Sequence, residues 1–372
     1  MPLSISNSDI PYRDIPNQPW LKILAVSFLL LVLAMIAWES LSRSMHHTTG
    51  TYLSGFEAMW ADERRKLDTP NNDIRVVLTG SSRILWASDL DIMETHLGTR
   101  PLQLALPGTS PAIFVEDIVN NTEFDGLIIV GVTPFLFNWM TEGYFGGPAL
   151  ERLRNELPSQ WSGTKLHEFL NEYFAFLDEG FSLFELVDHY TYASVPERAG
   201  SKNLSQQGWK LGNVYADRQT DMWSPIEERG SFDNIQITNF WTPGIDLENI
   251  QTPEELTEMS VAAVSFFEPV IAKLRARGGD IIFIRMPSEG LYKELDTASN
   301  HRENLWAPMI EGFNSPAINS MDYPELSSEL DIPEWSHLSR DSQDLWSARI
   351  VPFIEKAYRD SRGKNLYDLL NK

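Results

Sequence analysis

RVVLTGSSR, at residues 75–83, is a short apolar run that ends in a glycine and two serines, and it indicates the architecture of the chain. Its first part, residues 75–78, predicts a buried strand. Similar apolar runs recur at residues 102–106, 127–132 and 280–285. Helices are predicted from Ser88 or Asp89 to Gly98, at residues 111–120 and 254–277, and from about residue 341 to 358. Short apolar strands that alternate with helices predict an α/β fold with a parallel sheet covered on both faces.

A long uncharged stretch lies near the N-terminus. Residues 23–38, ILAVSFLLLVLAMIAW, carry no charge, and Trp20 and Lys22 extend the segment to about the 20 residues that cross a bilayer. The stretch is apolar on every side and has tryptophan at both ends, unlike a core helix. No small-x-small cleavage site follows it. We therefore expect an uncleaved transmembrane helix at residues 20–38 rather than a signal peptide.

The transmembrane helix divides the chain into parts. Residues 1–19 form a short tail that we expect in the cytoplasm, although basic residues on both sides of the helix make this orientation only weakly determined. Residues 39–72 are expected to form a juxtamembrane helix and linker, and residues 73–372 the α/β domain. An insertion at about residues 136–253 interrupts the alternating pattern and is either a substrate-binding lid or a variable excursion.

The insertion has two kinds of sequence. Residues 148–190 look helical and rich in aromatic residues, whereas residues 194–242 are polar and punctuated by glycine and proline. Its tryptophans are expected to stack on sugar rings or to form the core of the insertion; they are Trp161, Trp209, Trp223 and Trp241.

The charge of the chain argues against a nucleic-acid partner. There are 30 Lys and Arg residues against 52 Asp and Glu residues, which gives a formal net charge of −22. A surface this acidic repels polyanions. The chain has no cysteine, which excludes disulfides, thiolate metal sites and cysteine nucleophiles. Phosphate-binding loops and metal-binding motifs are also missing from the sequence, so it implies no cofactor and no metal.

Small polar residues follow three of the predicted strands. The strand ends read TGSSR at residues 79–83, PGTS at 107–110 and GVTP at 131–134. Ligands of an open parallel sheet bind beyond these carboxyl ends. A serine in the first turn of a helix can expose its hydroxyl and offer its backbone N–H to an oxyanion. Ser82 is therefore the candidate nucleophile, with a helix cap or an anion-binding turn as the alternative.

His337 is the candidate base among the seven histidines. It lies in DIPEWSHL, residues 331–338, just before the last predicted helix. Glu334, three residues upstream, could orient the imidazole and stabilise its charged form. Asp331 is the alternative acid. The other interpretation of His337 is an ordinary loop or capping histidine.

In combination, these segments resemble the SGNH/GDSL hydrolase superfamily. The resemblance covers residues 75–134 and 254–358, and it implies a flavodoxin-like three-layer fold. By position, it implies Ser82 as nucleophile, His337 as base and Glu334 in the place of the family's aspartate. The implied oxyanion hole consists of the Ser82 N–H, Gly108 and Thr133. Thr133 stands where the family normally has an asparagine, whose side chain is a longer donor.

The departures from the family pattern also fit the more divergent, membrane-anchored SGNH-like proteins of bacterial envelopes, such as those that resemble the teichoic acid D-alanine transfer and alginate acetylation proteins. These act in O-acyl transfer to surface polymers, commonly beside a membrane-bound O-acyltransferase. The resemblance therefore implies a serine esterase or O-acyltransferase of the cytoplasmic membrane, with a periplasmic domain, a glycan substrate and a multi-span acyltransferase partner. The alternatives are a non-catalytic glycan-binding or scaffolding subunit and a solute-binding or sensory domain.

Two arginines are candidate substrate-binding residues. Arg285 ends the strand predicted at residues 280–285, and Arg83 follows Ser82, so both are expected at the rim that carries the candidate site. A guanidinium there could hold a uronate carboxylate or a phosphate. The alternative for each is an ion pair with a neighbouring acid.

Overall fold

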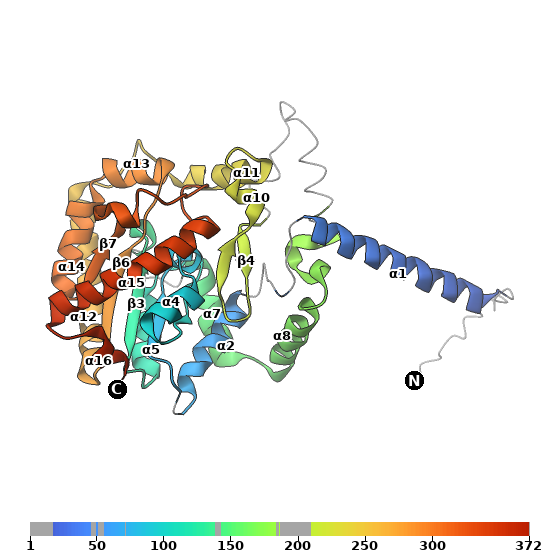
Figure 1. Cartoon of the computed structure of the whole chain (residues 1–372), viewed down its shortest axis with the longest axis horizontal. Helices are drawn as coiled ribbons and strands as arrows, with labels where there is room; N and C mark the ends of the chain where they lie inside the picture. The colour runs from blue at the N-terminus through green and yellow to red at the C-terminus, as the bar shows by residue number, and fades with distance from the viewer. Residues whose placement is uncertain are drawn as a thin grey trace, which may run out of the picture.

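The computed structural model describes residues 18–45, 50, 56–70, 72–137, 143–183, 186 and 210–371. Its centre is a parallel sheet of five strands in the order β2-β1-β3-β6-β7 (Figure 1). The strands are β1 (Val76–Thr79), β2 (Leu102–Gln103), β3 (Leu127–Val132), β6 (Asp280–Arg285) and β7 (Ala317–Asn319). This confirms the predicted α/β fold with a parallel sheet.

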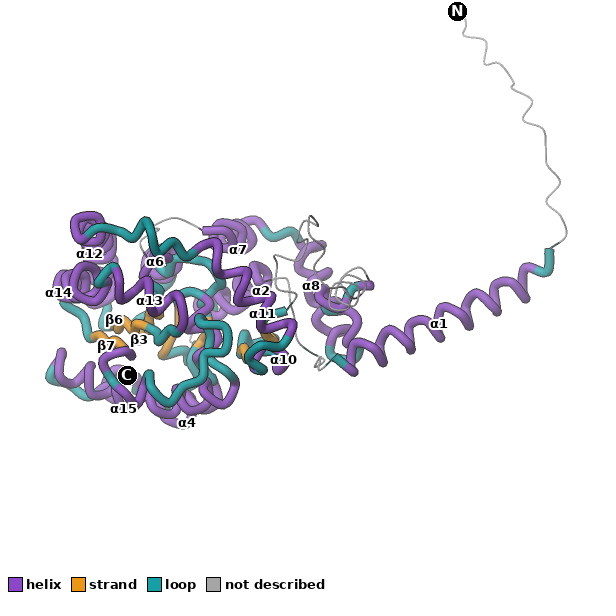
Figure 2. The backbone as a smooth tube through the Cα atoms, turned by 90° about the horizontal axis from the view of Figure 1, so that it is seen from above, coloured by secondary structure: helices purple, strands orange, loops and turns teal. Residues whose placement is uncertain are grey.

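Helices cover both faces of the sheet, which lies between two helical layers in Figure 2. Every residue of β1, β3 and β6 is buried, and their side chains alternate between the two faces. Leu78 and Ile282 belong to the core on one face, while Val77 and Phe283 belong to the core on the other. The first core includes α3 (Ser82–Ala87), α4 (Leu90–Leu97) and α15 (Arg340–Arg362); the second includes α2 (Phe56–Arg65), α5 (Ala112–Asn121), α12 (Pro253–Ala276) and α14 (Ala307–Phe313).

Capping residues explain several helix ends. The Asp89 side chain accepts a hydrogen bond from the Ile92 N–H (2.7 Å), and Gly98 ends α4 in the left-handed conformation. Thr252 and Glu255 form a capping box at the start of α12. The four helices expected in these regions are present within a few residues of their predicted bounds, apart from α15, which continues to Arg362.

The sheet differs from the sequence prediction at its edges. The run at residues 102–106 is a strand only at Leu102–Gln103, although the N–H of Leu104 still donates to the Leu78 carbonyl (2.7 Å). Strand β7 was not predicted because its three residues are too few to show a pattern. Short elements complete the domain: η1 (Lys66–Asp68), α13 (Gly290–Ala298), η5 (Arg302–Trp306), η6 (Ser320–Asp322), η7 (Pro324–Leu326) and α16 (Leu366–Leu370).

The insertion contains more regular structure than its composition suggested. Part of the polar stretch at residues 194–242, including Trp209, lies outside the described residues. The remainder forms an antiparallel hairpin and two helices. The described elements of the insertion are α6 (Pro134–Phe137), α7 (Gly143–Asn155), α8 (Pro158–Asn171), η2 (Ala175–Leu177), η3 (Glu179–Phe181), β4 (Gly212–Val214), β5 (Thr220–Met222), α10 (Ser224–Glu227), α11 (Phe232–Trp241) and η4 (Thr242–Gly244).

The N-terminal apolar segment forms one helix, α1 (Trp20–Ser44), which projects away from the α/β body in Figure 1. In the described part of the chain it is the one helix long and apolar enough to cross a membrane. It is therefore a single membrane anchor or a signal sequence. Residues 1–17 of the expected tail, and residues 46–49, 51–55 and 71 of the expected linker, lie outside the described residues. Helix α2, in that same expected segment, packs on the sheet through Trp60, which is fully buried.

Candidate functional site

The turn between β1 and α3 is shaped by a glycine. Gly80 has a φ of 149°, and a Cβ on it would lie 2.7 Å from the Gly131 carbonyl oxygen and 2.7 Å from Ile84 Cγ2. Only glycine therefore allows α3 to begin so close to the end of β3. This close approach places Ser81 and Ser82 at the carboxyl edge of the sheet.

The two serines of this turn have different environments. The buried Ser81 hydroxyl forms a 2.5 Å hydrogen bond with the Thr133 hydroxyl at the end of β3. Ser82, the first residue of α3, is only half-buried. Of the two, Ser82 is the serine that an external substrate can reach.

A buried acid–histidine pair lies in the loop that packs against α3. Glu334 and His337 are 0% and 1% exposed, and Glu334 Oε1 lies 3.0 Å from His337 Nδ1. The same oxygen accepts the backbone N–H groups of Ser336 and His337. Trp241 Nε1, from α11 of the insertion, donates to the other oxygen, Oε2. A neutral imidazole that donates its Nδ1 proton to the carboxylate carries its lone pair on Nε2.

His337 Nε2 is the atom of this pair that remains available for chemistry. It is buried and has no hydrogen-bond partner among the residues that the structure describes, so no hydrogen bond joins it to Ser82. The loop that carries it nonetheless lies against α3. Arg83 Nε donates to the Ser336 hydroxyl (3.3 Å), and the Trp86 ring is 5.2 Å from the His337 ring, centroid to centroid. Because Ser82 precedes Trp86 by one helical turn, both lie on the same side of α3.

Asp331, the alternative acid, does not contact His337 in the described structure. Its carboxylate forms an ion pair with Arg229 (2.6 Å), and both side chains are 46% exposed. Its backbone supports the loop, because the carbonyl accepts the Ser339 N–H and the N–H donates to the Ser342 hydroxyl (2.7 Å). The structure therefore joins Glu334, and not Asp331, to the histidine.

The three predicted oxyanion donors differ in how available each one is to a substrate. The Ser82 N–H is in the first turn of α3, where helical N–H groups have no partner within the helix. Gly108 lies in an exposed turn after β2 with a φ of 59°. The Thr133 hydroxyl is already engaged by Ser81 at 2.5 Å, which makes it a poorer donor to a substrate.

Arg285 takes part in a buried ionic network. Its guanidinium lies 2.8 Å from Asp296 Oδ2, and Asp296 Oδ1 is 2.8 Å from His301 Nδ1. Burial alone would raise the pKa of the Asp296 carboxyl, but the hydrogen bond from His301 and the charge of Arg285 hold that pKa at about 2. The ion-pair interpretation thus describes Arg285 in this structure.

Arg83 has a different setting. It is 3% exposed, its guanidinium carbon lies 4.8 Å from the centre of the Tyr292 ring, and burial lowers its pKa. Burial also raises the pKa of the Tyr292 hydroxyl to about 12. The contacts of Arg83 with Ser336 and Tyr292 join α3 to the His337 loop and to α13.

Backbone strain marks the residue beside Glu334. Trp335 has a φ of 76°, an unusual value for a bulky residue that costs about 1–3 kcal/mol. A Cβ on Gly290 would lie 2.4 Å from the Trp335 ring, so this ring packs directly on the start of α13. The Trp335 carbonyl also accepts the Glu289 N–H (3.0 Å). These contacts hold the His337 loop in place.

Two hollows lie at opposite edges of the sheet. One of about 220 Å³ lies beside the ends of β6 and β7 and is lined by Arg285, Asp296 and Asn319, among others. The larger one, of about 440 Å³, lies near the starts of β1 and β3 and contains none of the predicted site residues. Of the predicted site residues, Arg285 lines the hollow of about 220 Å³, whereas Ser82, Glu334 and His337 do not. We place the candidate site at the carboxyl edge because Ser82 begins α3 there and the His337 loop packs against α3.

Sequence reasoning missed the residues that support the site. Trp241 packs against the core, which is one of the two expectations for it, and its indole N–H also donates to Glu334, which was not predicted. Asp296, His301 and Tyr292 lie in segments without a motif, and only the fold brings them near Arg83 and Arg285. Over the described ranges, no group of three or more carboxylates and histidines is arranged to hold a metal ion.

Comparisons with known proteins add no assignment to this geometry. No protein-family model matches the sequence, and no curated protein matches it.

Proposed function

We propose that this protein is a membrane-anchored serine esterase or O-acyltransferase of the SGNH type, acting on a cell-envelope glycan through an acyl-serine intermediate. The observation that carries the proposal is the buried Glu334–His337 pair, whose unpartnered Nε2 lies in the loop packed against the first turns of α3. The strand order supports the flavodoxin-like arrangement of that superfamily, since it corresponds to 2-1-3-4-5 when renumbered along the chain.

The proposed reaction has two halves. Ser82 Oγ attacks the acyl carbonyl while His337 Nε2 takes its proton, and the histidine then protonates the leaving group. Glu334 holds Nδ1–H and stabilises the imidazolium, while the N–H groups of Ser82 and Gly108 stabilise the oxyanion. A sugar hydroxyl or water then attacks the acyl-serine with His337 again as base. The Ser82–His337 hydrogen bond forms when substrate is bound, as such bonds often tighten only in the complex.

Covalent labelling tests the proposal directly. The full chain in lipid nanodiscs is treated with a fluorophosphonate and assayed with a p-nitrophenyl ester. We expect the label on Ser82, and Ser82→Ala and His337→Ala should each lower ester hydrolysis by about a thousandfold or more. The exposed residues Ser265 and His96 supply controls, because their alanine variants should leave both readouts unchanged. Wild-type hydrolysis in Ser82→Ala would contradict the mechanism.

A non-catalytic subunit is the second candidate. The engaged Thr133 hydroxyl and the missing Ser82–His337 hydrogen bond favour it. Such a subunit would bind or scaffold a glycan with the same loops and without chemistry at Ser82. The labelling experiment separates the two, because a binding subunit would leave Ser82 unlabelled while retaining affinity for the polymer.

We further propose that α1 is an uncleaved anchor and that the domain lies on the periplasmic side of the cytoplasmic membrane, next to a multi-span O-acyltransferase. Contacts between the end of α1 and the insertion support the anchor. Trp38 Nε1 donates to the Phe181 carbonyl (2.7 Å), and Arg43 donates to the Tyr173 carbonyl (3.1 Å). If α1 were cleaved off as a signal peptide, these contacts would be lost.

A further inference from the structure

Helix α8 and the residues around it expose a group of large apolar side chains. Outside α1, twelve large hydrophobic residues of the described chain are strongly exposed, and six of them fall within residues 157–174. We call these six the α8 face; they are Leu157, Trp161, Leu166, Phe169, Tyr173 and Phe174, each 39–59% exposed. Exposed apolar side chains concentrated in this way usually mark a contact surface.

Lys165 of α8 takes part in two ion pairs, one of them with the α/β body. Lys165 lies 2.7 Å from Asp62 of α2 and 2.7 Å from Glu168 on its own helix. These ion pairs engage a cation that would otherwise project beside Trp161 and Phe169. The six apolar side chains stay exposed beside this engaged lysine, among the smaller polar residues Ser159, Gln160 and Ser162.

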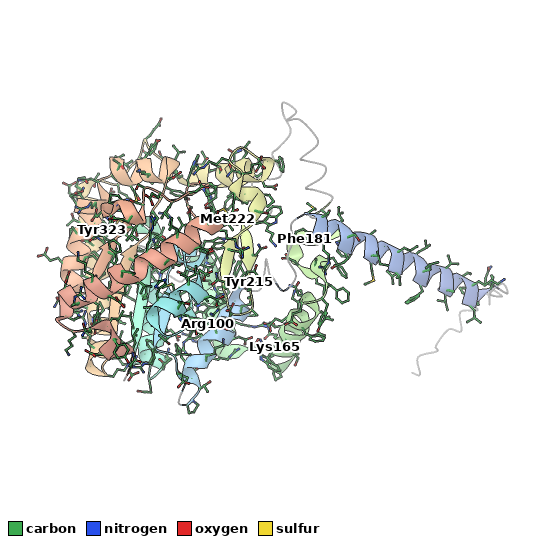
Figure 3. All side chains as sticks on the ribbon, in the orientation of Figure 1. Arg100, Lys165, Phe181, Tyr215, Met222 and Tyr323 are labelled. Atoms are coloured by element: carbon green, nitrogen blue, oxygen red, sulfur yellow. The ribbon has the colours of Figure 1, made fainter. Side chains whose placement is uncertain are left out.

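The α8 face is continuous with the end of α1. The Trp38 and Phe176 rings are 4.6 Å apart, centroid to centroid, and Phe176 N–H donates to Glu39 (3.2 Å). In Figure 3 Phe181 lies beside the body-proximal end of α1, and Lys165 marks α8 on the same side of the body. Figure 1 places α12 and α16 on the opposite side.

These contacts fix the height of the α8 face relative to a bilayer that α1 crosses. Trp38 ends the uncharged stretch, and tryptophan at that position is typical of the headgroup layer. Because Trp38 touches Phe176 and Phe181, residues 173–181 lie at about the same level. Trp161 and Tyr173 of the α8 face are themselves the residue types enriched at a membrane surface.

We propose that the α8 face lies in the headgroup layer of the phospholipid bilayer that α1 crosses, so that the chain meets the membrane at two places. The inference rests on the proposed anchoring of α1 and not on the chemistry of Ser82. The α8 face adjoins the apolar helix α1, and this favours lipid rather than a protein partner as the group that covers the face.

Single cysteines can test the proposal cleanly because the chain has none. The full chain is reconstituted in nanodiscs with a nitroxide on one cysteine, introduced by Trp161→Cys or Phe169→Cys. Collisions of the nitroxide with lipid-soluble oxygen and with a water-soluble nickel chelate are then compared. Val261→Cys and Tyr367→Cys, at side chains 60% and 72% exposed away from α1, are the matched controls. Leu30→Cys reports the middle of α1.

We expect the oxygen-to-nickel collision ratio at residues 161 and 169 to exceed that at residues 261 and 367 by severalfold. Ratios equal to those controls would show a water-facing surface and overturn the proposal. Protection from both reagents would show protein contact, such as a second copy, and would also overturn it. If Leu30→Cys itself reports water, the anchor fails and the proposal fails with it. Fluorophosphonate labelling of the same variants shows separately whether the site is intact and active.

Discussion

Glu334 is the residue on which the geometry of the site depends most. Its two oxygens accept the Nδ1 group of His337, two backbone N–H groups and the indole N–H of Trp241. A fully buried carboxylate needs such donors because water does not reach it. The same contacts hold the histidine ring in one orientation.

We predict that Glu334→Gln lowers ester hydrolysis by about a thousandfold or more, because an amide favours the wrong histidine tautomer and no longer stabilises the imidazolium. Trp241→Phe should lower it by about tenfold, through loss of one hydrogen bond to a charged acceptor. Steady-state kinetics across pH measures both effects. Asp331→Asn is the control, since the Asp331 side chain pairs with Arg229 at the surface. A larger loss in Asp331→Asn than in Glu334→Gln would assign the acid to the other residue.

The ionisation of the Asp296 carboxyl makes the stability of the fold depend on pH. Its pKa of about 2 in the folded protein lies below the value of about 3.9 for an unfolded chain. The carboxylate therefore stabilises the fold above about pH 4, and this contribution is lost as the pH falls toward 2. We predict that Asp296→Asn lowers the free energy of unfolding at pH 7 by about 3–5 kcal/mol, because it leaves Arg285 buried without its partner. Urea unfolding at pH 7, 4 and 2.5 measures both effects.

The exposed Asp360 supplies the control for this experiment. Asp360→Asn should change stability by no more than about 0.5 kcal/mol at any of these pH values. An Asp296→Asn variant as stable as the wild type at pH 7 would show that the network of Arg285 and His301 does not depend on the carboxylate.

At the residue scale, sequence reasoning located the central groups but not their supports. Ser82 follows a recognisable strand end, and Glu334 and His337 precede the long helix α15, so their positions could be expected from the order of elements. Their catalytic roles stay a prediction. Trp241 could not be found in this way because its partner, Glu334, is distant in sequence. Asp296 could not be found because its contacts with Arg285 and His301 depend on the path of the chain after β6.

At the scale of elements, the contact between α3 and β3 positions the serine turn. A Cβ on Gly131 of β3 would lie 2.5 Å from Ile84 Cβ, an atom fixed close to the α3 backbone. We predict that Gly131→Ala destabilises the protein by about 1–3 kcal/mol through overpacking, and that it displaces Ser82 enough to lower fluorophosphonate labelling. Thermal unfolding and the labelling rate test this together.

Gly163 of α8 is the matched glycine, because nothing lies within 4 Å of a Cβ built on it. Gly163→Ala should stabilise the helix by about 0.5–1 kcal/mol and leave labelling unchanged. If both alanine variants behaved alike, close packing of α3 on β3 would not be the cause.

Helices and strands that carry a local sequence signal could be predicted. Strands that form only because another strand pairs with them could not. The capping box of α12 and the apolar runs of β3 and β6 are local signals. Strand β7 has three residues and becomes a strand only because β6 pairs with it. The hairpin of β4 and β5 is likewise three residues on each side, within a polar segment.

At the scale of the whole molecule, α1 determines which compartment holds the domain. Formal charges up to Lys22 cancel, so the net charge of −22 belongs to the chain beyond the uncharged stretch. We predict that Tyr367→Cys reacts with a membrane-impermeant maleimide in intact spheroplasts. Ser8→Cys, in the N-terminal tail, should react only after lysis. Reaction of Tyr367→Cys only after lysis would place the domain in the cytoplasm.

The order of strands in the sheet also constrains how the chain is made. Strand β3 pairs with β6, whose residues are synthesised only after the whole insertion and α12. At about 5–20 residues per second, roughly 7–30 s of translation separate the two strands. During that time β1 and β3 lack the neighbour that completes the centre of the sheet. The centre of the sheet therefore cannot be completed until residues 280–285 have emerged from the ribosome.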